Sequence, residues 1–152
     1  MSDSSTLLPA DLHHTLIKVR GYHLDLYGHV NNARYLEFLE EARWGFTEAG
    51  GQLEWFAKSG LAFVIVNINI NYRRSAVMND ELDIATAMYK AGRRSAVIRQ
   101  RIFLKGTDTV VADADVTFVV FDPKANTAVA MEGELLDMFR KLPHWPEETP
   151  AA

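Results

Sequence analysis

The segment 33–49 constrains the fold more than any other, because it has helical spacing and is apolar around most of its circumference. Its polar side chains form only a narrow stripe, at Arg34, Glu37, Glu41 and Glu48. A helix of this kind has to be covered on most sides by other elements. Asn31 or Asn32 can cap its start, and Gly50-Gly51 ends it. We therefore expect one central, largely buried helix that the rest of the chain wraps.

The other patterned segments alternate apolar and polar residues with a period of two, which is typical of strands with one polar face. They predict strands over residues 15–23, 61–72, 81–89, 94–104, 109–121 and 128–131. Short helices are predicted over 52–58 and 133–142. Polar outer faces favour antiparallel pairing over a doubly wound parallel sheet. We expect an α+β domain in which one curved antiparallel sheet of five or six strands wraps the long helix.

Residues 106–108, Gly-Thr-Asp, predict a hairpin loop between two of these strands. One register places opposite charges together on the outer face and apolar residues together on the inner face. It pairs Arg99 with Asp115, Arg101 with Asp113, and Ile98 with Val116. We therefore interpret these arginines and aspartates as structural surface pairs and not as catalytic groups.

The segment 61–72 changes character halfway along. Its first half is apolar on both faces, so we expect it to be covered from both sides. In its second half Asn67, Asn69 and Asn71 alternate with apolar residues. These asparagines are most simply a solvated or subunit-facing side of a strand, and the alternative is contact with a polar ligand.

Length, composition and the two ends set the domain organisation. A chain of 152 residues, 48% of them hydrophobic, suits one domain with a real core. Residues 1–14 are polar, residues 143–152 carry three prolines and two glutamates, and neither end shows periodicity. We expect a single domain over 15–142, with partly disordered tails over 1–14 and 143–152.

Several classes of function are excluded or disfavoured. The sequence has no cysteine, which rules out disulfides, thiolate zinc sites, iron–sulfur clusters and a cysteine nucleophile. Sixteen basic residues against 20 acidic ones give a net charge of -4, which disfavours a nucleic-acid partner. There is no P-loop, GxGxxG, GxSxG or HExxH motif. Neither a targeting segment nor a membrane span is visible, so we expect a soluble cytoplasmic protein without membrane insertion.

A dense polar cluster lies in the loop that leads into the central helix. The unpaired N–H groups and the dipole of a helix N-terminus can polarise a carbonyl or hold an oxyanion. Asp25 could approach the same spot and serve as general base or nucleophile in attack on an acyl carbon. An aspartate here is also typical of a turn or cap. The spacing of His23, Asp25 and His29 additionally permits a metal set, although the loop lacks tight ligand spacing.

Two arginine pairs stand at the ends of predicted strands. Arg73-Arg74 ends one strand, and Arg93-Arg94 begins another. Either pair could bind phosphate groups, because the guanidinium matches phosphate geometry. The alternative for each pair is a charged strand end that is simply solvated.

The run 19–42, VRGYHLDLYGHVNNARYLEFLEEA, resembles the active-site segment of hotdog-fold acyl-CoA thioesterases. Within the 4-hydroxybenzoyl-CoA thioesterase-like group, it resembles the bacterial long-chain acyl-CoA thioesterases. The segment 67–76, NININYRRSA, also resembles that subgroup. The resemblance spans about residues 17–139. It implies the hotdog fold, a sheet curved around a central helix, and homodimers that often pair into homotetramers, with the active site at the dimer interface.

The resemblance also implies roles for residues of this chain. Asp25 matches the family's catalytic aspartate, and Asn32 matches the residue whose backbone amide faces the thioester carbonyl. Gly28 and His29 fall in the turn between them. The acyl chain is expected in an apolar tunnel beside the central helix and the CoA phosphates on basic surface residues. Candidates for contact with substrate are Asn31, Tyr35, Arg73, Arg74, Arg93 and Arg94.

The sequence thus predicts a hydrolase that converts an acyl-CoA, expected to be a long-chain fatty acyl-CoA, to free acid and CoA. This reaction requires no metal and no organic cofactor. Four alternatives stay open. They are a non-catalytic acyl-thioester-binding protein, a hydrolase of aryl-CoA or acyl-carrier-protein thioesters, a dehydratase or hydratase that relies on His29, and a purely structural domain.

Overall fold

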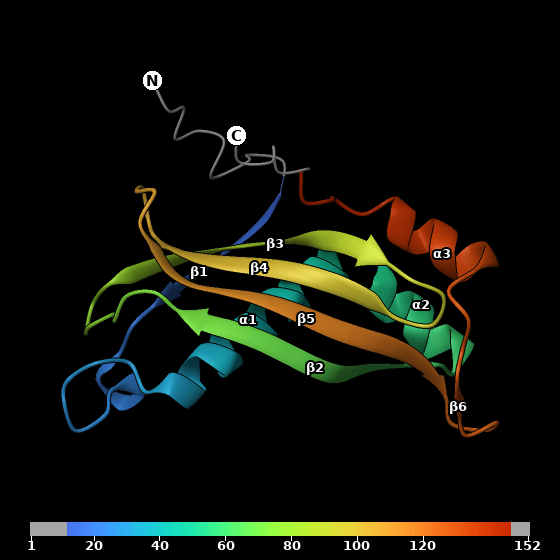
Figure 1. Ribbon diagram of the computed structural model, residues 1–152, viewed down its shortest axis with the longest axis horizontal. Helices are drawn as coiled ribbons and strands as arrows, with labels where there is room; N and C mark the ends of the chain where they lie inside the picture. Colours follow the sequence, from blue (N-terminus) through green and yellow to red (C-terminus); the bar gives the residue numbers. More distant parts are fainter. Residues whose placement is uncertain (1–11, 147–152) are drawn as a thin grey trace.

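The computed structural model describes residues 12–146 and folds as one curved sheet around a long helix (Figure 1). The strands are β1 (His13–Lys18), β2 (Ala62–Tyr72), β3 (Glu81–Ala91), β4 (Ala96–Leu104), β5 (Val110–Asp122) and β6 (Thr127–Ala128). The helices are α1 (Asn32–Ala49), α2 (Gln52–Ser59), α3 (Gly133–Arg140) and the short 3-10 helix η2 (Gly21–His23). Within residues 12–146, no helix has the length and apolar character needed to cross a membrane.

The sheet has six strands, and all of their pairings are antiparallel. The order is β1-β3-β4-β5-β2, with the short β6 added to β5, so β1 and β2 lie at the two edges. The hairpin register between β4 and β5 is confirmed, since Arg99 pairs with Asp115 and Ile98 with Val116. The α+β hotdog architecture expected from the sequence is therefore present.

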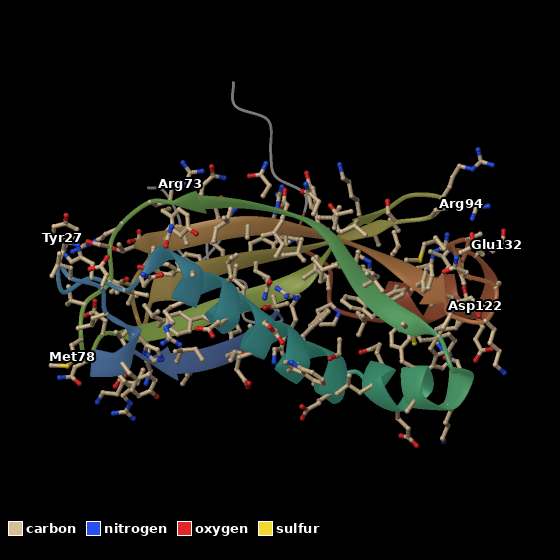
Figure 2. All side chains as sticks on the ribbon, turned by 90° about the horizontal axis from the view of Figure 1, so that it is seen from below. Tyr27, Arg73, Met78, Arg94, Asp122 and Glu132 are labelled. Atoms are coloured by element: carbon tan, nitrogen blue, oxygen red, sulfur yellow. The ribbon has the colours of Figure 1, made fainter. Side chains whose placement is uncertain are left out.

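Helix α1 crosses the concave side of the sheet, as the view from below shows (Figure 2). Its buried residues follow the helical period and pack on the strands: Tyr35, Phe38, Leu39, Ala42 and Phe46. The prediction that α1 is covered on most sides is wrong for the isolated chain. Leu36 and Trp44 are 37% and 49% exposed, and so one apolar side of α1 has no cover within the described residues.

Two strands have other bounds than the sequence periodicity predicts. The first strand was expected over 15–23, but β1 covers His13–Lys18 and the chain turns into η2 soon afterwards. Val19 is fully buried in the core, and its backbone bonds to Asn79 and Asp80, outside the sheet ladder. The last strand was expected over 128–131, but β6 is only Thr127–Ala128. Apolar composition continues past both strands, while hydrogen-bond pairing stops.

Residues 143–146 pack on the sheet, although the sequence assigns them to a tail. The Met88 N–H donates to the carbonyl of Pro143, and the Trp145 N–H donates to the carbonyl of Met88, at 3.0 and 2.7 Å. Trp145 is 7% exposed in a cluster with Leu12 and Phe103. The packed domain therefore extends beyond 15–142 at both ends, and the rest of both predicted tails lies outside the described residues.

Candidate active site

The loop before α1 is a tight turn fixed by backbone hydrogen bonds. The Asp25 N–H donates to the His29 carbonyl at 2.8 Å, and the Gly28 N–H donates to the Asp25 carbonyl at 3.1 Å. Gly28 has a φ of 77°, in the left-handed region where a side chain is strained. This turn brings Asp25 back toward the start of α1.

The Asp25 carboxylate is held by one of its two oxygens. Its Oδ1 accepts hydrogen bonds from the backbone N–H groups of Tyr27, at 2.8 Å, and His29, at 3.3 Å. These are the contacts of a turn-forming aspartate, so that interpretation of Asp25 is confirmed. Its Oδ2 makes no hydrogen bond with any residue in 12–146, so one oxygen of an oriented carboxylate is available for chemistry.

The first turn of α1 leaves the backbone donor of Asn32 free within the described residues. The Asn31 side chain is the cap, since its Oδ1 accepts from the Ala33 N–H at 2.9 Å, and the Asn31 carbonyl accepts from Arg34. The Asn32 N–H has no hydrogen-bond partner in the described part of the chain. Because the positive end of the helix dipole lies here, this amide is a ready donor to a developing oxyanion.

Asp25 and Asn32 line one cavity of about 390 Å³. The same cavity is lined by four more of the residues expected at the site or next to it: His29, Tyr35, Arg73 and Arg74. Gly28 shapes the turn and Asn31 caps the helix, so both lie beside the cavity without lining it. An acyl carbon in this cavity would have the carboxylate and the helix amide on its walls.

Tyr72 is a cavity residue that the sequence reading missed. Its hydroxyl donates to the Asn32 carbonyl at 3.0 Å, and its ring lies 5.4 Å from the ring of Tyr35. The Tyr35 hydroxyl accepts from the Ala76 N–H at 3.2 Å, and burial raises the pKa of Tyr35. Tyr72 therefore ties the end of β2 to the start of α1, and Tyr35 ties α1 to the segment after β2. The position of Tyr72, directly before Arg73-Arg74, was a signal that could have identified it.

Arg73 and Arg74 both bring positive charge to this cavity, but only Arg73 is paired with a carboxylate within the described residues. The Arg73 Nε donates to Asp113 Oδ2 at 2.8 Å, and this hydrogen bond raises the pKa of the guanidinium. The Arg74 side chain forms no ion pair within residues 12–146. Arg73 also lines a second, polar cavity of about 280 Å³ on the outer face of the sheet, with Asn69 and Asn71. An anionic ligand at the site would meet Arg74 as an uncompensated cation.

Arg93 and Arg94 are not brought to this site. Arg94 lies at the opposite end of the molecule from Tyr27 and Arg73 (Figure 2), where its Nη1 donates to the Ala128 carbonyl at 2.9 Å. The Arg93 carbonyl accepts from the Met131 N–H in the same region. Their sequence pattern resembles that of Arg73-Arg74, but topology places the start of β4 far from the start of α1.

The metal interpretation of the loop is not supported by its geometry. Within 12–146, no group of three or more His, Asp or Glu side chains could hold a metal ion. His23 instead accepts from the Arg20 N–H through Nδ1 at 2.9 Å, and its ring meets the edge of Phe38 at 4.9 Å. Burial lowers the pKa of His23, with a smaller contribution from the Arg34 charge. His23 is therefore a structural residue of the turn.

An apolar cavity of about 490 Å³ lies further along α1, between α1, α2 and β2. Its apolar lining comes from Leu53, Phe56, Phe63, Ile65 and Ile68. Arg43 also lines it, donating to Gln100 Oε1 at 3.1 Å, and burial lowers the pKa of this guanidinium. The helix thus has a polar cavity at its start and an apolar one along its length.

The curved antiparallel sheet and the central helix define the class as a hotdog-fold domain, and the cavity lined by Asp25 and Asn32 is its candidate active site. Comparison with known proteins agrees. The chain belongs to the thioesterase-like superfamily, whose family model matches residues 19–152.

Individual relatives narrow the comparison. The chain is 52% identical over 128 residues to the long-chain acyl-CoA thioesterase FadM of Escherichia coli, covering 84% of this chain and 97% of that protein. The crystal structure of the "YbaW Probable Thioesterase" from Escherichia coli is 51% identical, with a TM-score of 0.82 over 86% of this chain and 98% of that one. A 1,4-dihydroxy-2-naphthoyl-CoA thioesterase from Synechocystis, 16% identical, has a TM-score of 0.75 over 86% of this chain and 96% of its own, and so shows the fold alone.

Proposed function

We propose that this protein hydrolyses long-chain fatty acyl-CoA to the free acid and CoA. Two lines support the proposal: 52% identity to a long-chain acyl-CoA thioesterase across nearly its whole length, and the geometry of the candidate site. The single observation that carries it is the shared cavity of Asp25 and Asn32, with a free carboxylate oxygen and a free helix amide.

In the proposed mechanism the thioester carbonyl accepts a hydrogen bond from the Asn32 N–H. That bond and the helix dipole stabilise the negative charge that develops on this oxygen during attack. Asp25 Oδ2 either takes a proton from water, which adds to the carbonyl carbon, or attacks that carbon to form a mixed anhydride that water then opens. In both routes the carbon–sulfur bond breaks, and CoA leaves as a thiolate that takes up a proton.

The length of α1 bears on the substrate. Glu40, the first helical residue that lines the apolar cavity, lies eight residues after Asn32, which is about 12 Å along the helix. Only an acyl chain long enough to span that distance from the carbonyl would reach the apolar cavity. Burial of the remaining methylene groups there would favour long chains by about 0.8 kcal/mol each.

The CoA phosphates are proposed to lie on Arg74 and Arg73. Arg74 has no competing carboxylate in the described chain, and guanidinium groups bind phosphate strongly. Arg93 and Arg94 are left out of this proposal because they lie at the other end of the molecule.

A homodimer is part of the proposal. Val64 and Val66 of the edge strand β2 are 38% and 55% exposed, and Leu36 and Trp44 of α1 are uncovered. An unpaired, apolar strand edge invites pairing with a second copy, which would also cover α1. Two such dimers forming a tetramer, and a cytoplasmic location for the cysteine-free chain, complete the proposal.

The dimer can be tested by placing a charge on the β2 edge. Val66→Lys should convert the dimer to a monomer in analytical ultracentrifugation, since a buried unpaired charge opposes edge pairing. Lys58→Arg, on the exposed end of α2, is the control and should leave the mass unchanged. A wild-type protein that sediments as a monomer would contradict the dimer.

The activity is tested by following thiol release from palmitoyl-CoA with a thiol reagent. Asp25→Asn keeps the shape of the side chain but removes its basicity, and should abolish most hydrolysis. Asp108→Asn, in the exposed β4–β5 loop, is the matched control. Near-normal hydrolysis by Asp25→Asn would rule out both roles of Asp25. A panel of short, long and aromatic acyl-CoAs and an acyl-carrier-protein thioester tests the substrate class. Binding without thiol release would instead favour a non-catalytic acyl-thioester-binding protein.

A further inference from the structure

Arg43 is a charged residue on the lining of the apolar cavity beside β2, and the proposed mechanism does not use it. Aromatic and aliphatic side chains, among them Phe56, Phe63 and Ile68, form most of this cavity of about 490 Å³. Arg43 is half-buried there, and burial lowers the pKa of its guanidinium. Since a charge in apolar surroundings is costly unless hydrogen bonds compensate it, the partners of this guanidinium indicate its role.

A buried hydrogen-bond network holds one part of the guanidinium against the sheet. Arg43 Nη1 donates to Gln100 Oε1 at 3.1 Å. Gln100 is fully buried, and its Nε2 donates to the Leu39 carbonyl at 3.0 Å and to Thr86 Oγ1 at 3.1 Å. The amide orientation is fixed, because a backbone carbonyl can only accept. The position of the Arg43 head group is therefore set by β3 and β4.

The other donors of Arg43 are accessible. A guanidinium has five N–H donors, and Gln100 is the only hydrogen-bond partner of this one within residues 12–146. Neither Nε nor Nη2 is sealed inside the described part of the chain, where Gln52 Oε1 is the one inaccessible side-chain atom without a partner. A ligand in the cavity that Arg43 lines can therefore reach these donors.

Glu40 is the other charged residue on this lining. Its Oε2 accepts from the Trp44 indole N–H at 3.3 Å, and it forms no ion pair with Arg43 in the described chain. It does act on Arg43 through space, raising the pKa of the guanidinium against the larger effect of burial. One cation and one anion leave the lining without net charge, so an anionic ligand would be repelled by Glu40. A neutral acceptor meets no such repulsion.

The place of Arg43 on α1 indicates where along an acyl chain that acceptor would have to be. Arg43 lies eleven residues after Asn32, which is about 16 Å along the helix, and helical side chains lean back by up to about one turn of 5.4 Å. Its donors are then about 11–16 Å from the Asn32 amide. An extended chain covers roughly 1.2 Å per bond, since three peptide bonds' worth of backbone spans 3.3–3.6 Å. The distance corresponds to roughly 9–14 bonds by the same measure.

We propose that Arg43 selects acyl chains that carry a neutral oxygen acceptor, such as an oxo group, at this distance from the thioester. The oxygen accepts from Nε or Nη2 of Arg43, and the methylene groups on either side lie against Phe56 and Phe63. The inference rests on the proposed function, because it takes the acyl chain to run along α1 from the Asp25 site. It adds a substrate class and a residue that selects it.

Two oxo positions in one chain test the proposal by thiol release. The oxo group of 12-oxostearoyl-CoA is about 11 bonds from the carbonyl and reaches Arg43, whereas that of 6-oxostearoyl-CoA stops short of it. Wild type should show a kcat/KM at least about tenfold higher for 12-oxostearoyl-CoA, because only this oxygen gains a hydrogen bond to a charged donor. Arg43→Met should bring the ratio of the two kcat/KM values to about one. Arg140→Met, on the exposed end of α3, is the matched control and should keep the wild-type ratio.

Calorimetric titration of Asp25→Asn with the same two CoA thioesters measures the preference without turnover. Absence of thiol release by wild type, together with a Kd preference that Arg43→Met removes, would reject the proposed hydrolysis and retain the role of Arg43. Thiol release at equal kcat/KM from both oxo chains would overturn the role of Arg43 and retain the hydrolysis. An unchanged ratio in Arg43→Met would also overturn it. The comparison of the two chains in wild type needs no variant, so the proposal can fail even if Arg43→Met does not fold.

Discussion

The two ends of α1 present opposite chemistry. At its start an N–H group and a carboxylate oxygen are free at an exposed cavity, and the loop around them is held by short backbone hydrogen bonds. At its end the free group is a carbonyl oxygen, that of Gln52, and it is buried. An exposed donor beside a base suits a reaction that has to admit and release substrate and water. A buried acceptor without a partner costs stability instead, because it has given up its hydrogen bonds to water.

The largest expected effect separates the two ends by function. Asp25→Asn should reduce kcat/KM for palmitoyl-CoA by roughly 10²–10⁴-fold, the usual contribution of a general base. Gln52→Leu, at the other end of α1, should keep hydrolysis within about threefold of wild type, since no charge-assisted bond at the Asp25 site is affected. Loss of hydrolysis in Gln52→Leu would mean that the two ends are not independent.

The next effect separates them by stability. Phe46 is 2% exposed and packs at the end of α1, so Phe46→Ala should lower the free energy of unfolding by about 3–5 kcal/mol. Urea unfolding followed by circular dichroism measures this change. Folded Phe46→Ala at low temperature should still hydrolyse substrate, because the loop at the start of α1 has its own hydrogen bonds. A folded variant without activity would contradict that separation.

A smaller effect is expected from the tyrosine that bridges β2 and α1. Tyr72→Phe removes the hydrogen bond to the Asn32 carbonyl, so we expect a stability loss of about 1 kcal/mol in urea unfolding. Hydrolysis should fall by up to about fivefold, which corresponds to about 1 kcal/mol, since the Asn32 peptide is less well fixed. Tyr89→Phe, on β3, is the control. Unchanged kcat/KM in Tyr72→Phe would remove Tyr72 from the positioning of the site.

The smallest effect is a pH dependence of the free energy of unfolding, to which one histidine near each end of α1 contributes. Burial lowers the pKa of His13 at the end of α1 and of His23 at its start, relative to 6.5 in the unfolded chain. Folding therefore favours the neutral forms, so their contribution is complete above pH 6.5 and is lost as the pH falls below it. Urea unfolding near pH 7.5 and near pH 5.5 should show a smaller acid loss in His13→Gln and His23→Gln than in wild type. An equal loss in all three would assign it to other groups.

Much of the fold could be predicted because it depends on local periodicity. The helix over α1, the strands β2 to β5 and the β4–β5 register each follow from side chains that have to share a face. The ends of β1 and β6 could not be predicted, because they depend on which backbone groups find partners. The burial of Trp145 was missed for a similar reason, since a proline-rich segment shows no sign of the β3 backbone that it will meet.

The candidate site was predictable in part. The loop around Asp25 and the Asn cap are consecutive in sequence, so their chemistry could be recognised together. Arg73 and Arg74 reach the site only through the sheet order, and the equally suggestive Arg93 and Arg94 do not.

The segment 143–146 has a consequence for how copies of this chain can stack. By covering Phe103 with Trp145, it removes one patch of the convex side of the sheet from the surfaces open to neighbours. Two copies of the chain could therefore not pack through Phe103 while Trp145 covers it. Deletion of the chain from residue 143 onward would expose that apolar patch. The exposed patch would favour self-association through the convex side of the sheet.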